Sequence, residues 1–231
     1  MRLRGHELLT QPAELSFWRA PTDNDRGCAM PYEFARWAQA GRYARAETVT
    51  AKQLEHAVEI SAVYRLATDG RCTAVLTWQG GTAELPEFGL LLPLDPAYQQ
   101  LEWLGRGPEF TAPDRKNGAL IGLWQRAVQE GAEVCVRPQE YAAHMDVYRA
   151  ALTGNGLPPL ELRSETGTGG FALTVCPWTP QELENAEHTW QLPPVTRTVV
   201  RCALAQRGVG GDDSWGSLRW LCLKRTSSLI L

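Results

Sequence analysis

Hydrophobic and polar residues alternate along several short stretches of the chain. In residues 58–66 an apolar side chain occupies nearly every second position, which is the period of a β-strand with one buried face. The same alternation returns in residues 72–78, 171–175 and 200–204, and a shorter candidate covers residues 133–136. An Asp-Gly turn signal separates the first two runs, as in a hairpin. The pattern predicts a chain that consists mainly of β-strands.

Only two segments have the signals of a helix. Residues 31–40 begin with proline and are followed by Gly41, the arrangement found where a helix starts and stops. Thr179 and Glu182 have the spacing of a capping box, with a proline at the first helical position, and predict a short helix toward Ala186. We therefore expect two short helices beside the strands.

The 21 glycines and 15 prolines are spread along the whole chain, where they separate many short strands. This distribution is typical of a sandwich or barrel and not of alternating strands and helices. The runs at residues 154–159 and 167–170 are interpreted as turns, because no linker, repeat or charge block marks a domain boundary. The predicted architecture is one domain of two packed sheets.

Composition excludes several classes of protein. A hydrophobic content of 44% is too high for a disordered chain, and a net charge of −3 gives no basic excess for nucleic acid. No apolar run approaches the ~20 residues of a membrane span, and the N-terminus lacks the apolar stretch of a secretory signal. The six cysteines are scattered, as in a cytosolic protein with reduced thiols. We expect a cytoplasmic protein that binds neither nucleic acid nor membranes.

The common catalytic motifs for phosphate, dinucleotide, serine and zinc chemistry are missing from the sequence. Its four histidines stand apart from one another, so we expect no metal site. Acidic residues are numerous, but sequence alone does not place two of them across a sugar ring, as glycoside hydrolysis requires.

One polar cluster occupies residues 19–27. Asp23, Asn24 and Asp25 precede Gly27, and consecutive Asx residues favour turns that hold an irregular loop. The loop is either a structural turn or the border of a binding site, with Gly27 as its pivot.

A second cluster, Gly-Val-Gly-Gly-Asp-Asp-Ser-Trp, occupies residues 208–215. Its glycines permit close backbone approach, while Asp212 and Asp213 can accept hydrogen bonds. Trp215 lacks the flanking apolar pattern of a core strand, which makes it a candidate for stacking on a ligand. The alternative is that Trp215 folds back and fills the edge of the sandwich.

Several long segments carry a family resemblance. They occur in the order RAPTDNDRG, LPEFGLLL, LEWLGRGP, DRKNGALIG, VRPQEYAAHMDV, AEHTWQLPP and QRGVGGDDSW between residues 8 and 215. Together they resemble the C-terminal domain of the large bacterial β-galactosidases of glycoside hydrolase family 2. The same stretch forms part of the small subunit where that enzyme is split into two chains.

The resemblance implies a fold and a partner. The fold is an all-β, large antiparallel β-sandwich of the super-sandwich, galactose mutarotase-like type, as one domain over residues 8–231. The partner is a TIM-barrel domain or chain that carries the acid/base and nucleophile glutamates, together with the Mg and Na expected there. By this resemblance the present chain has no catalytic residue and no cofactor of its own.

The resemblance also assigns roles to residues. Trp215 occupies the position of an indole that stacks on the galactoside in the family. The residues that border the same site lie in two loops: Asp23, Asn24, Asp25, Gly27, Asp212 and Asp213.

Three segments depart from the family pattern. Residues 60–64 compress two strands into one, and residues 107–114 replace a Glu-Asn-Tyr segment in an expected interface loop. Residues 216–231 form an atypical tail, which is a truncated end, a frame-shifted tail or a divergent strand. Its apolar residues would be exposed along the last sheet edge: Leu221, Leu223, Leu229 and Ile230.

The leading hypothesis is a β-galactosidase small subunit or C-terminal domain, inactive alone, that helps bind terminal β-D-galactosides such as lactose for retaining hydrolysis by the barrel. One alternative is a stand-alone carbohydrate-binding or aldose 1-epimerase-like protein, with His144 and Glu140, or His188 and Glu187, as acid and base. Another is a purely structural assembly domain. Because a sandwich that normally packs on a barrel exposes an apolar face, we also expect self-association into a homo-oligomer.

Overall fold

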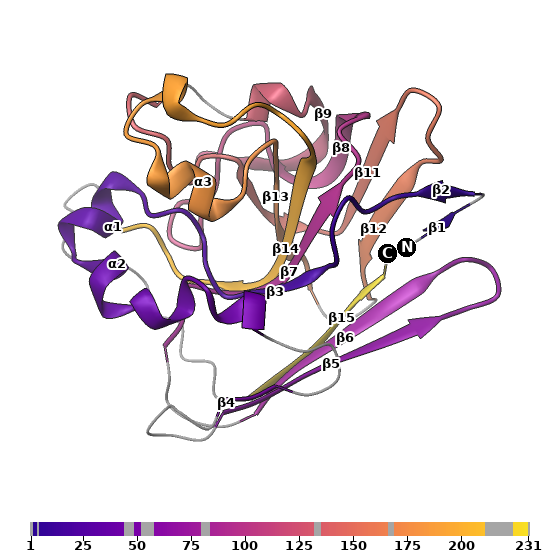
Figure 1. Ribbon diagram of the computed structural model, residues 1–231, viewed down its shortest axis with the longest axis horizontal. Helices are drawn as coiled ribbons and strands as arrows, with labels where there is room; N and C mark the ends of the chain where they lie inside the picture. The colour runs from indigo at the N-terminus through magenta and orange to yellow at the C-terminus, as the bar shows by residue number, and fades with distance from the viewer. Residues whose placement is uncertain are drawn as a thin grey trace.

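Two antiparallel β-sheets packed face to face form the body of the molecule (Figure 1). The structure is a computed structural model that describes residues 2–3, 5–43, 49–51, 58–79, 84–131, 135–165, 169–210 and 224–230. The smaller sheet has five strands, in the order β10-β13-β14-β7-β3. Their bounds are Ala143–Val147 for β10, Phe171–Cys176 for β13, Thr198–Gln206 for β14, Glu87–Leu94 for β7 and Glu14–Ser16 for β3.

The larger sheet has eight strands, in the order β4-β5-β6-β15-β12-β11-β8-β9. Their bounds are Val49–Ala51 for β4, Val58–Leu66 for β5, Cys72–Gln79 for β6, Lys224–Ile230 for β15, Leu160–Ser164 for β12, Arg149–Gly154 for β11, Tyr98–Gly107 for β8 and Leu120–Ala127 for β9. A separate pair joins β1 (Arg2–Leu3) to β2 (His6–Glu7). Figure 1 shows the β5–β6 hairpin on the opposite side of the sandwich from the helices.

Large aromatic side chains fill the space between the sheets. Trp78 on β6 and Trp103 on β8 are 0% and 1% exposed. The ring centroid of Trp78 lies 5.8 Å from that of Phe88 on β7 and 5.9 Å from that of Trp37. Burial of side chains of this size is a large stabilising contribution, so this cluster ties the two sheets together.

The alternation of hydrophobic residues located strands correctly. Three of the four predicted strands coincide with β5, β6 and β13, and the fourth lies inside β14. All strand pairs of both sheets are antiparallel, and the predicted all-β sandwich is confirmed. The candidate at residues 133–136 falls partly outside the described residues, and Cys135 and Val136 are not in a strand.

The predicted capping box is present at the start of α3 (Pro180–Asn185). The Thr179 hydroxyl accepts a hydrogen bond from the Glu182 backbone N–H at 3.2 Å, and the Glu182 carboxylate accepts one from the Thr179 N–H at 2.8 Å. Two backbone donors that the helix leaves unpaired are thereby satisfied.

Replacement of Thr179 by alanine is expected to lower the free energy of unfolding by about 1 kcal/mol, because the cap is lost. Urea denaturation followed by circular dichroism measures this difference. Thr196→Ala, in an exposed loop, is the control and should leave the unfolding midpoint unchanged. Equal midpoints for the two variants would contradict a stabilising role for the cap.

The helix predicted over residues 31–40 is wrong in its extent. Helix α2 (Met30–Glu33) stops at Phe34, and 3₁₀ turns follow at η1 (Ala35–Trp37) and η2 (Ala40–Tyr43). The break lets Trp37, 3% exposed, pack on Phe17 at 5.7 Å. The described residues hold three short α-helices where two short helices were expected; the others are α1 (Asp23–Gly27) and α3, with 3₁₀ turns η3 (Gln129–Gly131) and η4 (Thr189–Gln191).

The atypical tail contains a strand. Strand β15 pairs along its whole length with β6 and also with the end of β12, through Arg163 opposite Ile230 and Ser164 opposite Leu229. Residues 224–230 of the tail are therefore part of the larger sheet. The expectation of a ragged last edge is wrong for residues 224–230, because they pair along their whole length with β6 and, at Leu229 and Ile230, also with β12. Leu221 and Leu223 lie outside the described residues.

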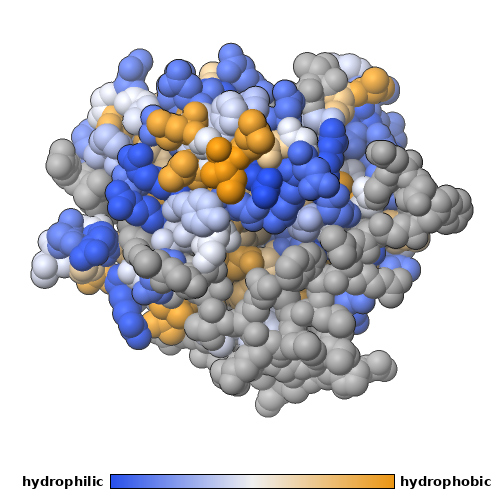
Figure 2. Space-filling model, turned by 180° about the vertical axis from the view of Figure 1, so that it is seen from behind, coloured by the Kyte–Doolittle hydropathy of each residue, from blue (hydrophilic) through white to orange (hydrophobic). Residues whose placement is uncertain are grey.

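Some large apolar side chains remain on the surface. Leu104, Ile121 and Leu123 on the paired strands β8 and β9 are exposed. Figure 2 shows, from behind, a small group of hydrophobic side chains in the upper half of the molecule, bordered by hydrophilic ones. No helix in the described part of the chain is long and apolar enough to cross a membrane.

Candidate functional site

The first polar cluster folds into helix α1 and not into a loop of Asx-turns. The Thr22 hydroxyl accepts a hydrogen bond from the Asp25 backbone N–H at 3.2 Å, and the Asp25 carboxylate accepts one from the Thr22 N–H at 2.7 Å. This is a capping box, and it makes Asp23, Asn24 and Asp25 the first turn of a helix that ends at Gly27. The predicted irregular loop is therefore corrected to a short capped helix.

Asp25 has a structural position within this helix. Its carboxylate receives two hydrogen bonds from the Arg19 guanidinium, at 2.5 and 2.9 Å, and the two side chains are 1% and 0% exposed. Arg19 also donates to the carbonyl oxygen of Gly208 at 2.9 Å. The buried Arg19–Asp25 pair thus joins the first polar cluster to the start of the second.

Asp114 holds the second cluster from the other side. Its carboxylate oxygens accept hydrogen bonds from the backbone N–H groups of Val209 and Gly210, at 3.0 and 2.9 Å. A Cβ atom at Gly208 would lie 2.1 Å from the same carboxylate, and Gly210 has a φ of +84°. The two glycines are needed because one faces Asp114 and the other adopts a left-handed conformation.

Replacement of Asp114 by asparagine should lower the free energy of unfolding by about 1–2 kcal/mol, because one of two charge-assisted hydrogen bonds is lost. Chemical denaturation of the purified chain measures the loss. Asp69→Asn, at the exposed tip of the β5–β6 hairpin, is the matched control: Asp69 also bonds Arg71, but in contact with solvent, so its replacement should shift the midpoint clearly less than that of Asp114. If the two variants unfold at the same urea concentration, Asp114 does not hold this segment.

The two polar clusters therefore lie side by side. A Cβ atom at Gly210 would be 3.7 Å from the Asn24 side chain, so α1 contacts the glycine-rich run. Asp212, Asp213 and Trp215 lie outside the described residues, two to five positions after Gly210 along the chain. Sequence reasoning selected both clusters but missed Arg19 as the link and Asp114 as the support, although DRKNG was among the family segments.

A hollow of about 520 Å³ opens beside this junction. One side is formed by Thr22, Asp23 and Asn24, with Val209 next to them. The other lining residues include Phe110, Arg115, Arg137, Gln139 and Tyr141. The volume lies within the range of sites for small molecules. We call this space the junction hollow.

An aromatic and cationic stack forms one wall of the junction hollow. The rings of Phe110 and Tyr141 are stacked, with centroids 4.9 Å apart and an interplanar angle of 24°. The Arg115 guanidinium lies 5.6 Å from the Phe110 centroid. Flat apolar faces beside hydrogen-bond donors are the combination that suits a sugar ring, because the ring has apolar C–H faces and polar hydroxyls.

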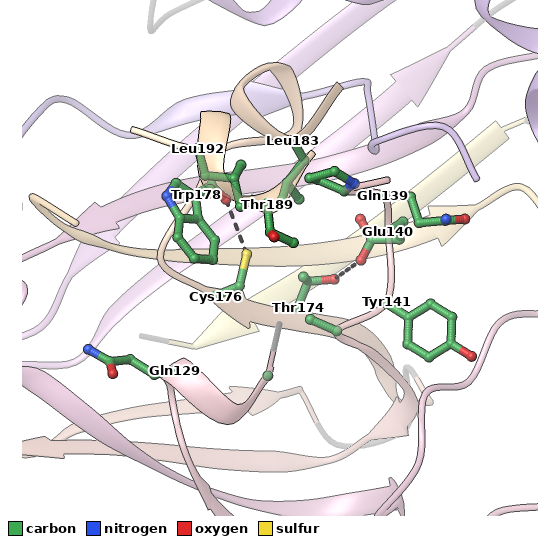
Figure 3. A pocket seen from close by; sticks show the side chains of 13 residues that line it. Gln129, Gln139, Glu140, Tyr141, Thr174, Cys176, Trp178, Leu183, Thr189 and Leu192 are labelled. Atoms are coloured by element: carbon green, nitrogen blue, oxygen red, sulfur yellow. Dashed lines mark hydrogen bonds between the residues drawn. The ribbon is translucent and has the colours of Figure 1, made fainter. Parts of the chain in front are cut away.

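A second, smaller pocket of about 220 Å³ lies on the other side of the residue 138–142 segment (Figure 3). Thr174 donates a hydrogen bond to Glu140 at 3.1 Å, and the Cys176 thiol contacts the carbonyl oxygen of Trp178 at 3.1 Å. Burial raises the pKa of the Cys176 thiol to about 11, so the thiol is protonated at neutral pH. The Tyr141 ring points away from this pocket in Figure 3.

Glu140 belongs to a buried charge cluster on the five-stranded sheet. Arg201 on β14 bonds Glu87 on β7 at 3.0 Å and also bonds Glu140, and all three side chains are 3% exposed or less. Burial, with the neighbouring Glu140 carboxylate, raises the pKa of Glu87 despite Arg201. Burial alone would lower the pKa of Arg201, but Glu140 and Glu87 raise it overall.

The residue pairs considered for epimerase chemistry are not formed. The His144 ring is 2% exposed, stacks on Trp103 at 4.2 Å and has no hydrogen bond to Glu140. Burial, and then the charge of Arg126, lower the pKa of His144 to about 3, so the ring is uncharged at neutral pH and cannot act as an imidazolium acid. Exposed His188 stacks on Trp190 at 5.9 Å, and no hydrogen bond joins it to the Glu187 side chain in the described structure.

Metal-binding groups do not converge in the described ranges, where no set of three or more His, Cys, Asp or Glu side chains could hold an ion. The five cysteines that the structure describes are all free thiols.

The chain is similar in sequence to β-galactosidases and to a β-galactosidase small subunit. The family model described as "Beta galactosidase small chain" matches residues 1–222. The β-galactosidase BgaC of Bifidobacterium adolescentis is 33% identical over 91% of this chain but only 22% of its own length. The β-galactosidase small subunit of Latilactobacillus sakei is 30% identical over 94% of this chain and 81% of its own length.

Another long relative is matched over a similar share of its own length. The β-galactosidase of Halalkalibacterium halodurans is 32% identical over 92% of this chain and 23% of its own length. The present chain therefore spans about a fifth of the full-length relatives it matches, and most of the small subunit. The order of the polar clusters, the sandwich and these matches agree: the chain belongs to the β-galactosidase small-chain family.

Proposed function

We propose that this chain works as the small subunit or C-terminal domain of a β-galactosidase, helping to bind terminal β-D-galactosides such as lactose. The observation that carries the proposal is the junction of the two polar clusters, where Arg19 bonds both Asp25 and Gly208. This junction fixes the start of the segment that leads to Trp215. Asn24 on α1 lies beside Gly210, where that segment begins. We assign Asp23, Gly27, Asp212 and Asp213 to the border of the same site.

We assign catalysis to the partner, because the paired carboxylates in the core of this chain are inaccessible to a substrate. Retaining hydrolysis uses two carboxyl groups about 5–5.5 Å apart that both contact the sugar. Glu87 and Glu140 both bond Arg201, but each is only 1% exposed and bonded within the core. They cannot act on a substrate, so we assign the acid/base and nucleophile to a TIM-barrel chain or domain, along with any Mg or Na. This chain would then be inactive alone and would supply the wall on which the galactoside rests.

We further propose that the chain works with a larger partner in the cytoplasm. We infer a larger partner because the full-length relatives are more than four times as long as the matched part. The exposed apolar side chains of β8 and β9 are suited to contact with that partner or with another copy of the chain. A cytoplasmic enzyme fits the free, scattered cysteines.

Hydrolysis of o-nitrophenyl β-D-galactoside tests the proposal. The purified chain is assayed alone and after mixing with a family 2 large chain that ends after its barrel. The expected result is no hydrolysis by either chain alone and hydrolysis by the mixture. Hydrolysis by this chain alone, or none in the mixture despite a stable complex seen by size-exclusion chromatography, would overturn the proposal.

A further inference from the structure

Strand β9 leaves one edge of the larger sheet open. Among the described strands it stands at the end of that sheet, so one of its edges pairs with β8 and the other has no partner strand. The outer N–H and C=O groups of an edge strand are a template for pairing with another chain. A second strand is therefore the occupant that the backbone of β9 fits.

The other sheet edges in the described part of the chain are short or irregular, whereas β9 is neither. Strands β3 and β4 have three residues each, and the register of β10 shifts between His144 and Val147. Strand β9 has eight residues and pairs with β8 without a shift. Because short strands and bulges are common protections of a sheet edge, β9 lacks the protection that the other edges have.

The side chains of β9 place no charge on its outer side. The sequence of the strand contains no proline, and its single charged residue is Arg126. The Arg126 guanidinium is directed into the sandwich, where it donates to the carbonyl oxygen of Val175 on β13 at 3.1 Å. An edge without outward charges is open to pairing with another strand.

Exposed apolar side chains follow the same strand. Ile121 and Leu123 are 52% and 63% exposed on the outer face of the sheet, and Leu104 on β8 lies opposite Leu123. Leu120, at the start of β9, is exposed as well. Cross-strand pairs of large apolar side chains stabilise a sheet, so the strand that fits this edge is also apolar.

The sequence of β9 is complementary to itself when two copies run antiparallel with Gly122 at the twofold axis. Ile121 of each copy then faces Leu123 of the other, and Leu120 faces Trp124. No like charges are opposed in this register. Glycine at the axis leaves room where the two backbones approach each other.

A neighbouring register fits less well. With Leu123 at the axis, Ile121 would face Gln125 and Leu120 would face Arg126. Apolar side chains would then lie opposite polar ones, so the apolar residues select the register with Gly122 at the axis.

We propose that this chain forms a homodimer through antiparallel pairing of β9 with β9 of a second copy, which joins the two eight-stranded sheets into one. The interface is isologous, because both copies use the same strand. Main-chain hydrogen bonds hold the two strands together, and the pairs of Ile121 with Leu123 determine the register. The dimer goes beyond the proposed function and does not depend on it, since the residues that form it lie on β8 and β9.

Strand β9 also lies away from the segment that we assign to galactoside binding. In Figure 1, α1 is at the left of the molecule and β9 is at the top, right of centre. A larger partner at the α1 end and a second copy at β9 therefore use different parts of the surface.

Analytical ultracentrifugation of the purified chain tests the dimer. We expect a monomer–dimer equilibrium whose dissociation constant rises about 10- to 100-fold when Ile121→Lys and Leu123→Lys are combined, because lysines of the two copies then face each other. Leu66→Lys, at an exposed leucine at the end of β5, is the matched control and should leave the constant unchanged. Circular dichroism shows that each variant is folded. A monomer at every concentration, or equal effects of the β9 and β5 variants, overturns the inference.

Cysteine cross-linking tests the register. Ile121→Cys and Leu123→Cys are placed in separate chains and oxidised, alone and mixed. We expect cross-linked dimers mainly in the mixture, because only unlike positions face each other, and the unmodified chain gives the background from its native cysteines. Equal cross-linking of the mixture and of each variant alone overturns the proposed pairing.

Mixing with a family 2 large chain separates the two occupants that β9 could have. In the assembled enzyme, the combined lysine variant should lower the mass measured by light scattering without loss of β-galactoside hydrolysis. An equal mass for both proteins, with one copy of this chain in each complex, would show that the large chain covers β9 and would overturn the inference. If mixing gives no hydrolysis, the proposed function fails, while a dimer of this chain that depends on Ile121 and Leu123 still supports the inference.

Discussion

Replacement of Arg201 by methionine is expected to lower the free energy of unfolding by about 3–5 kcal/mol at pH 7. Arg201 bonds Glu87 at 3.0 Å and also bonds Glu140, and it donates to the carbonyl oxygen of Trp18 at 3.2 Å. Methionine fills similar space but leaves two buried carboxylates without a cation. Removal of one partner from a buried ion pair is costly because the remaining charge cannot be solvated. Urea denaturation of both proteins at pH 7 measures the difference.

A matched variant and a change of pH sharpen the Arg201 experiment. Arg149→Met removes an arginine that also bonds two glutamates, Glu102 and Glu161, but at a half-exposed site, and should cost less than about 1 kcal/mol. The penalty of Arg201→Met should shrink as the pH falls, because Glu87, whose pKa is raised by burial, can then take up a proton. A penalty similar to that of Arg149→Met, or one independent of pH, would contradict this account.

In the unmodified chain, the raised pKa of Glu87 sets the direction in which its contribution to stability changes with pH. Because its pKa is raised in the folded state, the folded protein holds a proton more tightly than the unfolded chain. Its contribution is therefore fully present below the ordinary pKa of a glutamate and is lost as the pH rises through the raised value. Glu87→Gln should remove this part of the pH dependence of stability.

The second large effect is expected for Trp215→Ala in the assembled enzyme. Loss of a stacked indole should weaken substrate binding by about 1–3 kcal/mol, which corresponds to a KM about 5- to 150-fold higher. Steady-state kinetics with o-nitrophenyl β-D-galactoside measures KM and kcat separately. Trp190→Ala removes an indole that is 78% exposed on η4 and should leave both constants unchanged. Unchanged kinetics for Trp215→Ala would show that this residue does not contact the substrate.

The fold was predictable where one face of a strand is buried. Strand β6 alternates buried and half-buried residues, and the hydrophobic pattern located it. Strand β7 has buried residues at every position, so it shows no alternation and the pattern did not identify it. One face of β7 packs in the core, and on the other Leu91 lies beside Trp37, Ala38 and Pro180, so neither face is exposed.

The site was predictable only in part, because its supports come from distant residues. The two polar clusters were selected by composition, but Asp114 is 95 and 96 residues from the N–H groups that it binds. Asp25 was interpreted as part of a loop because local propensity does not reveal a bond to buried Arg19. Thr22, one position before the first Asx residue, was the available signal, since Thr22 and Asp25 have the spacing of a cap.

The position of β15 determines when the larger sheet can form during synthesis. In the described sheet, β15 is the strand that connects β4-β5-β6 to β12-β11-β8-β9. Until residues 224–230 leave the ribosome, both β6 and β12 have an unpaired edge that can bind strands of other nascent chains. Long-range pairing of this kind is slow, since loop closure must precede it. The larger sheet is therefore completed only after residues 224–230 have been translated. Until then the unpaired edges make the nascent chain prone to aggregation and dependent on chaperones.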